Sequence, residues 1–202
     1  EIDSWDALFD PKYEKQILMY DSIRDSVGLA LIKLGYSINT KNQQEIDEAA
    51  ELLVEQKPLV LAYGTDDLRM TMINGSAALA PMYAGDAAYS MMDNPDLRYV
   101  IPREGANIFV DGMCILKTTD VYDAALRFVD FMMRPDIAAL NAEYNCYSTP
   151  EDDALALVDP ELLENTAFNP PKEDLANCEY YEHLEKDILR MYEDAWMKVK
   201  IA

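Results

Sequence analysis

The sequence has little of the chemistry that metal sites and disulfide frameworks need. Its 202 residues include one histidine, His183, and three cysteines at positions 114, 146 and 178. The cysteines are odd in number and do not follow the spacing of metal ligands. We therefore expect neither a zinc site nor a complete disulfide framework.

Positive charge and long apolar runs are also scarce. The chain has 17 Lys and Arg against 38 Asp and Glu, a formal net charge of −21. The electric field of such a negative protein repels phosphate backbones, which argues against nucleic-acid binding. The same field attracts cations. Surplus acid is equally a common means of keeping a protein soluble. No apolar run approaches the roughly 20 residues of a transmembrane helix, and residues 1–5 do not form a signal segment. The abrupt start suggests a piece of something longer.

Recognisable enzyme motifs are missing. The sequence has no phosphate-binding glycine loop, no nucleophile elbow and no metalloprotease helix. The single histidine falls in the last helical stretch, where an exposed position explains it. Two carboxylates can act as acid and base, so an acid-pair glycosidase is the enzyme alternative, although no pair is distinctive. We expect no catalytic residues, no bound metal and no cofactor.

Apolar and aromatic residues are plentiful, and helix and strand signals alternate. Half of the residues are apolar and a tenth are aromatic, which predicts a folded protein of one or two domains. Helices are expected at 22–34, 43–55, 68–74, 85–93, 120–133, 136–144 and 179–200; strands at 59–63, 77–83, 97–101 and 108–116; and a polar loop at 64–67. Strands separated by helices predict a mainly parallel α/β sheet.

Acidic and aromatic side chains gather at the predicted strand ends. Tyr83 closes one strand, and Phe109 and Asp111 share one face of the last strand because they are two residues apart. Asp21 and Asp25 flank the start of the first helix. In open α/β sheets, ligands sit beyond the carboxyl ends of strands. Carboxylates and aromatic rings gathered there would suit an organic ammonium ligand.

Each of these residues also has a purely structural interpretation. The sequence from Ser22 to Asp25 has the form of a capping box, and for Asp25 this reading stands slightly ahead of ligand binding. Tyr83 and Phe109 are of types that more often belong to a core. Asp111 differs, because a carboxylate inside an apolar strand is costly without a partner. Its position favours a function, with a buried structural hydrogen bond as the alternative.

Five segments then follow one another in an order that points to a family. They are SWDALFDPKY at 4–13, KLGYS at 33–37, PREG at 102–105 followed by Asp111, AALRFVDFMMRPD at 124–136, and YSTP at 147–150. Together they resemble the substrate-binding proteins of spermidine/putrescine ABC transporters. Each segment is moderately specific, and their order covers essentially the whole chain.

The resemblance implies a fold and a division into lobes. The fold is the bilobal α/β fold of periplasmic binding proteins of type II, with one lobe nearly complete and the other partial. Residues 1–107 would form the main part of lobe two and 156–202 its closing helical part. Residues 108–155 would be the returning segment of lobe one, whose opening part is absent.

The resemblance also implies a function. Such a receptor closes its cleft on a polyamine, putrescine or spermidine, and delivers it to an ABC permease in the membrane. It works outside the cytoplasm and has no catalytic step. The alternatives are a receptor for another cationic or metal solute on the same fold, a sensor domain, and the acid-pair glycosidase.

Four polar residues fall at or beside the polyamine contacts of the family. Asp111 matches a carboxylate that grips an amine, and Asp25 matches an acidic contact usually filled by glutamate. Ser22 falls where the family commonly has aspartate. Asp21, next to it, could substitute with a shifted geometry.

Three aromatic residues complete the implied site. Tyr83 and Phe109 take positions typical of the tryptophans that enclose the aliphatic chain, and Tyr181 falls near a position often held by glutamine. Tyrosine and phenylalanine keep an aromatic wall but attract cations less strongly than tryptophan. These departures could favour a smaller diamine or a different cation.

The returning segment carries an expectation of its own. Without the opening part of lobe one, its apolar faces around Phe128, Phe131 and Met132 should be exposed or covered by another chain. We therefore expect self-association of this chain, with exchange of elements as one route.

Overall fold

A short parallel sheet lies at the centre of the protein, which a computed structural model describes over residues 2–65 and 67–202. Strand β1 (Ile17–Tyr20) pairs in parallel with β2 (Val60–Gly64), and on its other side Ile17 forms a parallel bridge with Leu79. Every residue of β1 is buried. The parallel arrangement expected from the sequence is therefore confirmed, with β1 in the middle.

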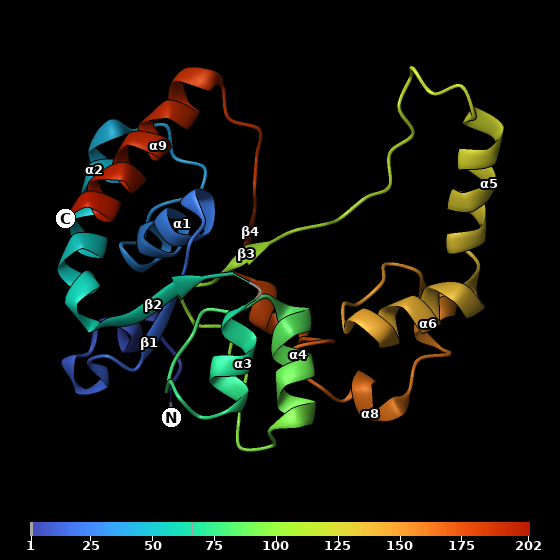
Figure 1. Ribbon diagram of the computed structural model, residues 1–202, viewed down its shortest axis with the longest axis horizontal. Helices are drawn as coiled ribbons and strands as arrows, with labels where there is room; N and C mark the ends of the chain where they lie inside the picture. The colour runs from blue at the N-terminus through green and yellow to red at the C-terminus, as the bar shows by residue number, and fades with distance from the viewer. Residues whose placement is uncertain (1, 66) are drawn as a thin grey trace.

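Three helices pack together beside this sheet. They are α1 (Ile23–Lys33), α2 (Gln43–Gln56) and α9 (Lys186–Ile201), which Figure 1 shows as one layer. The apolar stripe of α2 is buried as its helical spacing predicts, and Tyr192 of α9 is fully buried against it. This layer and β1 form the main hydrophobic core.

The other helices lie on the far side of the sheet and beyond it. They are α3 (Leu68–Ile73), α4 (Ala84–Asp93), α5 (Tyr122–Met132), α6 (Pro135–Asn145), α7 (Asp152–Leu155) and α8 (Pro160–Leu163). Of the short 3-10 helices, Trp5–Phe9, Pro11–Tyr13 and Lys57–Leu59 pack instead against the main core, and Lys172–Leu175 precedes the last strand. A second core around Phe168 joins α4, α6 and α8. This core contains residues from each of the three predicted ranges, 1–107, 108–155 and 156–202. The division of the chain into lobes therefore stays a prediction.

Several predicted elements differ from those observed. The ranges 77–83 and 97–101 are extended or irregular instead of forming strands, and the last helix begins at Lys186 because Glu179–Tyr180 forms strand β4. Strand β4 pairs in parallel with β3 (Asn107–Ile108). The strand predicted at 108–116 is wrong beyond Ile108, because the chain there leaves the body and finds no neighbouring strand. Glu1 and Asp66, in the predicted N-terminal range and the loop 64–67, lie outside the described residues.

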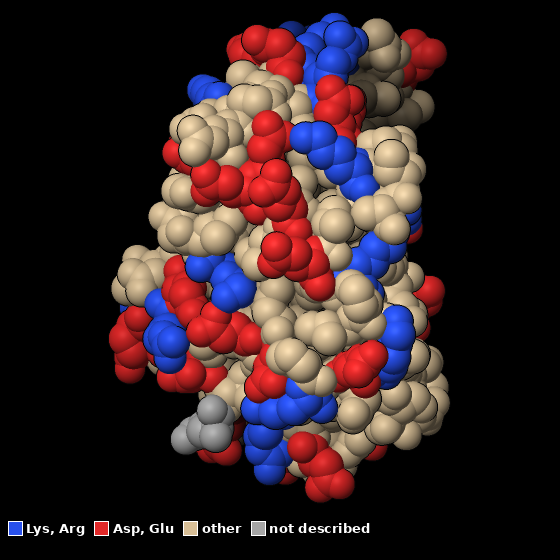
Figure 2. Space-filling model, turned by 90° about the vertical axis from the view of Figure 1, so that its left-hand side faces the viewer, with Lys and Arg blue, Asp and Glu red and all other residues tan. Residues whose placement is uncertain are grey.

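The surface carries both signs of charge. Figure 2 shows Asp and Glu interspersed with Lys and Arg on the face that lies at the left of Figure 1. One such pair joins Lys198 of α9 to Asp47 of α2, with 2.6 Å between Nζ and Oδ1. Within the described part of the chain, no helix has the length and apolar character needed to cross a membrane.

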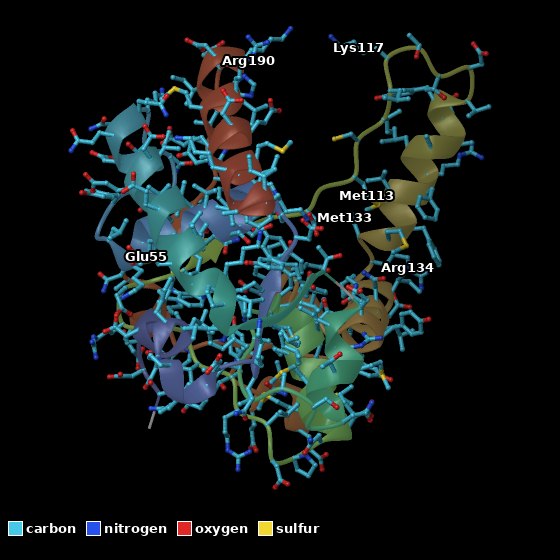
Figure 3. The ribbon with its side chains drawn as sticks, turned by 60° about the vertical axis from the view of Figure 1, so that its left-hand side comes forward. Glu55, Met113, Lys117, Met133, Arg134 and Arg190 are labelled. Carbon is cyan, nitrogen blue, oxygen red and sulfur yellow. The ribbon has the colours of Figure 1, made fainter. Side chains whose placement is uncertain are left out.

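Helix α5 stands apart from the main core. Figure 1 shows it at the opposite end of the molecule from α2 and α9, and Figure 3 shows Met113 and Lys117 on the extended segment that leads to it. No residue of α5 is buried: Phe128 is 58% exposed and Phe131 is 44% exposed, while Met132 is half-buried. The predicted exposure of this apolar face is confirmed.

We expect the chain to self-associate through this face, because a continuous apolar surface gains free energy when it leaves water. Light scattering should give a mass above the 22.9 kDa of one chain. Phe128→Lys should lower that mass, whereas Asp130→Lys, a control on the same exposed helix, should not. A monodisperse monomer of the unaltered chain would contradict the expectation.

Candidate functional site

A cavity of about 860 Å³ lies where three strands end and two helices begin. Tyr20 ends β1, Phe109 follows β3 and Tyr181 follows β4, while Asp25 lies in the first turn of α1 and Tyr83 precedes α4. All five residues line the cavity. Asp25, Tyr83, Phe109 and Tyr181, predicted from four distant parts of the sequence, are thus brought together.

The carboxylate of Asp25 is the polar centre of this site. It accepts hydrogen bonds from the Ser22 hydroxyl at 2.5 Å, the Tyr83 hydroxyl at 2.9 Å and the Tyr181 hydroxyl at 3.0 Å. A carboxylate has about four lone-pair positions, so the three hydroxyls leave capacity for a further donor. Each hydroxyl oxygen also keeps lone pairs that can accept from the same ligand. The cluster can therefore hold an ammonium group.

Ser22 plays a different role from the predicted one. It occupies the N-cap position of α1 with extended backbone angles, φ −140° and ψ 129°, but its side chain makes no capping hydrogen bond. Its hydroxyl instead donates to the Asp25 carboxylate. The predicted capping box is therefore wrong, because the hydroxyl is turned toward the carboxylate of Asp25.

Aromatic rings form a continuous wall beside the carboxylate. Tyr20 and Tyr83 stack at a centroid distance of 4.9 Å, and Tyr83 meets Phe109 edge to face at 5.8 Å. Phe109 in turn meets Tyr147 edge to face at 6.1 Å. Such a wall can cover methylene groups and attract a cation through the ring faces.

Tyr147 extends the aromatic wall beyond the residues that line the cavity, and no sequence prediction placed it there. It lies after α6, nearly forty positions beyond Phe109, and reaches the wall because the chain returns to α4. Its ring packs so closely on Gly85 that a Cβ there would lie 2.3 Å from two ring carbons. The YSTP segment at 147–150 was a signal for the family, but only the return of the chain gives Tyr147 this place.

The tyrosines of the cavity are held in their neutral form. Burial raises the pKa of Tyr20 well above its usual value, and burial raises the pKa of Tyr99 to about 12. For Tyr181, burial and then the Asp25 charge raise the pKa, while Arg24 lowers it in part. At neutral pH these groups are hydroxyls that donate and accept hydrogen bonds. The described residues also contain no group of three or more His, Cys, Asp or Glu placed to hold a metal.

Two predicted carboxylates lie away from this cavity. Asp21 accepts from the Lys200 ammonium of α9 at 2.7 Å and does not line the cavity, so it does not substitute for Ser22 here. Asp111 is exposed on the segment after Phe109. The expectation of a carboxylate within a buried apolar strand is wrong, because neighbouring Val110 is 75% exposed.

A parallel α/β body that gathers aromatic side chains around a carboxylate at its strand ends has the arrangement expected of a ligand-binding site. Residues 1–170 match the family described as bacterial extracellular solute-binding proteins. The chain belongs to this family, and the fold expected from the resemblance is confirmed. The family's name places its members outside the cytoplasm, as expected.

Individual relatives agree with this assignment. The spermidine/putrescine-binding periplasmic protein of Salmonella typhimurium is 31% identical over 199 residues, which are 98% of this chain and 57% of the relative. Solved structures of a spermidine/putrescine ABC transporter protein from Listeria monocytogenes and of the substrate-binding protein PotD from Streptococcus pneumoniae have TM-scores of 0.93 and 0.87, at 37% and 34% identity. Each covers 100% of this chain, and this chain covers 62% of each. The chain thus spans about three fifths of the length of these relatives.

Gly85→Ala should destabilise the protein by about 1–3 kcal/mol, because the new methyl group overpacks the Tyr147 ring. This loss should exceed the gain of up to about 1 kcal/mol that alanine brings to a helix. The free energy of unfolding from denaturant melts measures it. Gly112→Ala is the control, since a Cβ there meets no atom within 4 Å. A Gly85→Ala protein as stable as the Gly112→Ala protein would contradict the close packing of Tyr147.

Proposed function

We propose that the full-length protein carrying this sequence is an extracytoplasmic receptor that binds a polyamine, putrescine or spermidine, and delivers it to an ABC permease. The observation that carries the proposal is the Asp25 carboxylate with its three hydroxyl partners beside a wall of four aromatic rings. A carboxylate and hydroxyl oxygens suit an ammonium group, and aromatic faces suit methylenes. A polyamine combines both.

The relatives support the same ligand class. Besides the spermidine/putrescine-binding proteins, a putrescine/agmatine-binding protein of Pseudomonas aeruginosa is 27% identical over 210 residues. All of these ligands carry positive groups on an aliphatic chain. A net charge of −21 adds a long-range attraction for such cations.

Closure of a cleft around the ligand is the mechanism we propose. The parallel pair β3 and β4 lies at the predicted crossing near residue 108, and each strand is followed at once by a site residue, Phe109 and Tyr181. A ligand that contacts both residues would favour one relative arrangement of the parts of the protein joined by β3 and β4 over the others. The permease would recognise the closed form. No catalytic step is needed.

Asp111 has a separate place in this proposal. It stands two residues beyond Phe109 on the segment that leaves the body, exposed to solvent. As part of the predicted lobe one, it would meet the second ammonium group of the ligand when the cleft closes. A buried carboxylate without a matching cation is costly, so the spacing of Asp25 and Asp111 would select ligand length.

The alternatives have less support from the site. A metal receptor needs several ligands around one ion, and the described residues contain no group of three or more His, Cys, Asp or Glu that could hold one. A glycosidase requires two carboxyl groups about 5–10 Å apart around a sugar. In the described cavity the groups that bond the Asp25 carboxylate are three hydroxyls, not a second carboxyl group.

Calorimetry on the full-length protein should detect binding of putrescine or spermidine and no binding of neutral amino acids. Asp25→Asn should lower polyamine affinity at least about tenfold, equivalent to roughly 1.4 kcal/mol, because the site loses its charge while keeping its shape. Asp21→Asn removes the same charge just before α1, at the Lys200 pair, and should change affinity less than about twofold. Absence of polyamine binding, or preference for an anion, would refute the function.

Asp111→Asn in the same protein should also lower polyamine affinity at least about tenfold. The loss should be greater for the ligand whose second ammonium group Asp111 meets, so putrescine and spermidine are titrated in parallel. Asp120→Asn, another exposed carboxylate on the same segment, is the control. Equal affinities in the two variants would remove Asp111 from the site.

A further inference from the structure

The hydroxyl of Tyr181 reaches Asp25 from a segment with little structure of its own. Tyr181 follows the two-residue strand β4, and its neighbour Tyr180 is 59% exposed. The next helix, α9, begins only at Lys186. Something other than regular secondary structure must therefore hold the Tyr181 backbone in place.

Asn39 supplies that support by bonding the backbone on both sides of Tyr181. Its Nδ2 donates to the carbonyl of Tyr180 at 2.8 Å, and its Oδ1 accepts from the backbone N–H of Glu182 at 2.9 Å. These two hydrogen bonds fix the backbone at Tyr180 and Glu182, and so they fix the direction in which the Tyr181 side chain points. Asn39 itself does not line the cavity.

Arg24 contacts the ring of Tyr181, whereas Asn39 bonds the backbone on either side of that residue. Its guanidinium carbon lies 4.6 Å from the centroid of Tyr181 and 5.2 Å from that of Tyr192, so the flat group contacts both rings. Its Nη2 donates to the Asn39 side-chain oxygen at 3.0 Å and to the Ile38 carbonyl at 3.1 Å. Arg24 therefore joins the two supports of Tyr181 into one unit.

The loop that carries Asn39 is anchored in the main core. The hydroxyl of Tyr192, a fully buried residue of α9, donates to the carbonyls of Ile38 at 3.2 Å and Thr40 at 2.9 Å. A continuous series of contacts thus runs from the core through Asn39 and Arg24 to Tyr181 and ends at Asp25. Neither Asn39 nor Arg24 need touch a ligand to influence the site.

We propose that Asn39 and Arg24 are positioning residues that set the affinity of the Asp25 site by holding the Tyr181 hydroxyl against the carboxylate. The proposal rests on the proposed function, because its main readout is polyamine affinity. Without Asn39 the segment 179–182 is free to shift, and Asp25 loses one of its three hydroxyl partners. The site then loses both an acceptor for the ammonium group and its preformed geometry.

A double-mutant cycle in the full-length protein tests this with putrescine and spermidine as probes. Asn39→Ala should lower affinity about tenfold, a change of roughly 1.4 kcal/mol. In a Tyr181→Phe background the same substitution should cost less than about twofold, because the hydroxyl through which Asn39 acts is already gone. Unchanged affinity in the single variant, or an equal tenfold loss in both backgrounds, would overturn the proposal.

Two further variants separate positioning from general stability. Asn169→Ala is the control, since Asn169 also bonds a backbone group, the Leu163 carbonyl at 3.2 Å, and neither residue lines the cavity. It should leave affinity unchanged. Arg24→Lys keeps the charge but loses the flat guanidinium, and it should lower affinity several-fold only while the Tyr181 hydroxyl is present. If Asn39→Ala does not fold, this variant decides the question.

Amide hydrogen exchange distinguishes failure of this proposal from failure of the function. If the unaltered protein binds neither putrescine nor spermidine, the proposed function is refuted, and Asn39→Ala should still speed exchange at residues 179–182. Unchanged exchange there would refute the positioning role itself.

Discussion

The site depends on one interaction, the convergence of three hydroxyl groups on the carboxylate of Asp25. The hydroxyls come from Ser22 beside it, from Tyr83 before α4 and from Tyr181 after β4. A half-buried carboxylate needs such partners, because the protein replaces only part of the water that would solvate its charge. The hydrogen bonds therefore stabilise the charge of Asp25. They also join three segments that are distant in the sequence at one wall of the cavity.

The strand ends explain why this convergence occurs where it does. β1, β3 and β4 end at the same region, and the residues at or directly after their ends are Tyr20, Phe109 and Tyr181. The two short strands β3 and β4 contribute little stability of their own. Their role is to direct side chains, since each strand is followed at once by an aromatic residue that lines the cavity.

Charge has two separate roles in this protein. On the face that Figure 2 shows, acids are interspersed with basic residues, as the pair between Lys198 and Asp47 illustrates. Exposed pairs of this kind contribute little to stability. Asp25 differs because its partners are neutral hydroxyls, so its charge is not cancelled by a neighbouring lysine as that of Asp21 is by Lys200. The net charge makes a cationic ligand plausible, and the local partners of Asp25 select where it would bind.

The sequence by itself determined the longer helices except for the start of the last one, the parallel α/β class, the family and four of the residues that line the cavity. These features depend on local periodicity, on strand ends or on ordered motifs. Tertiary structure alone decided that Asp21 pairs with Lys200 and that Tyr147 joins the aromatic wall. Tertiary structure also ended β3 at Ile108 and left Asp111 exposed, because a strand persists only where a neighbouring strand receives its hydrogen bonds. Contacts between residues far apart in the chain leave no local periodicity, so the folded structure was needed to reveal them.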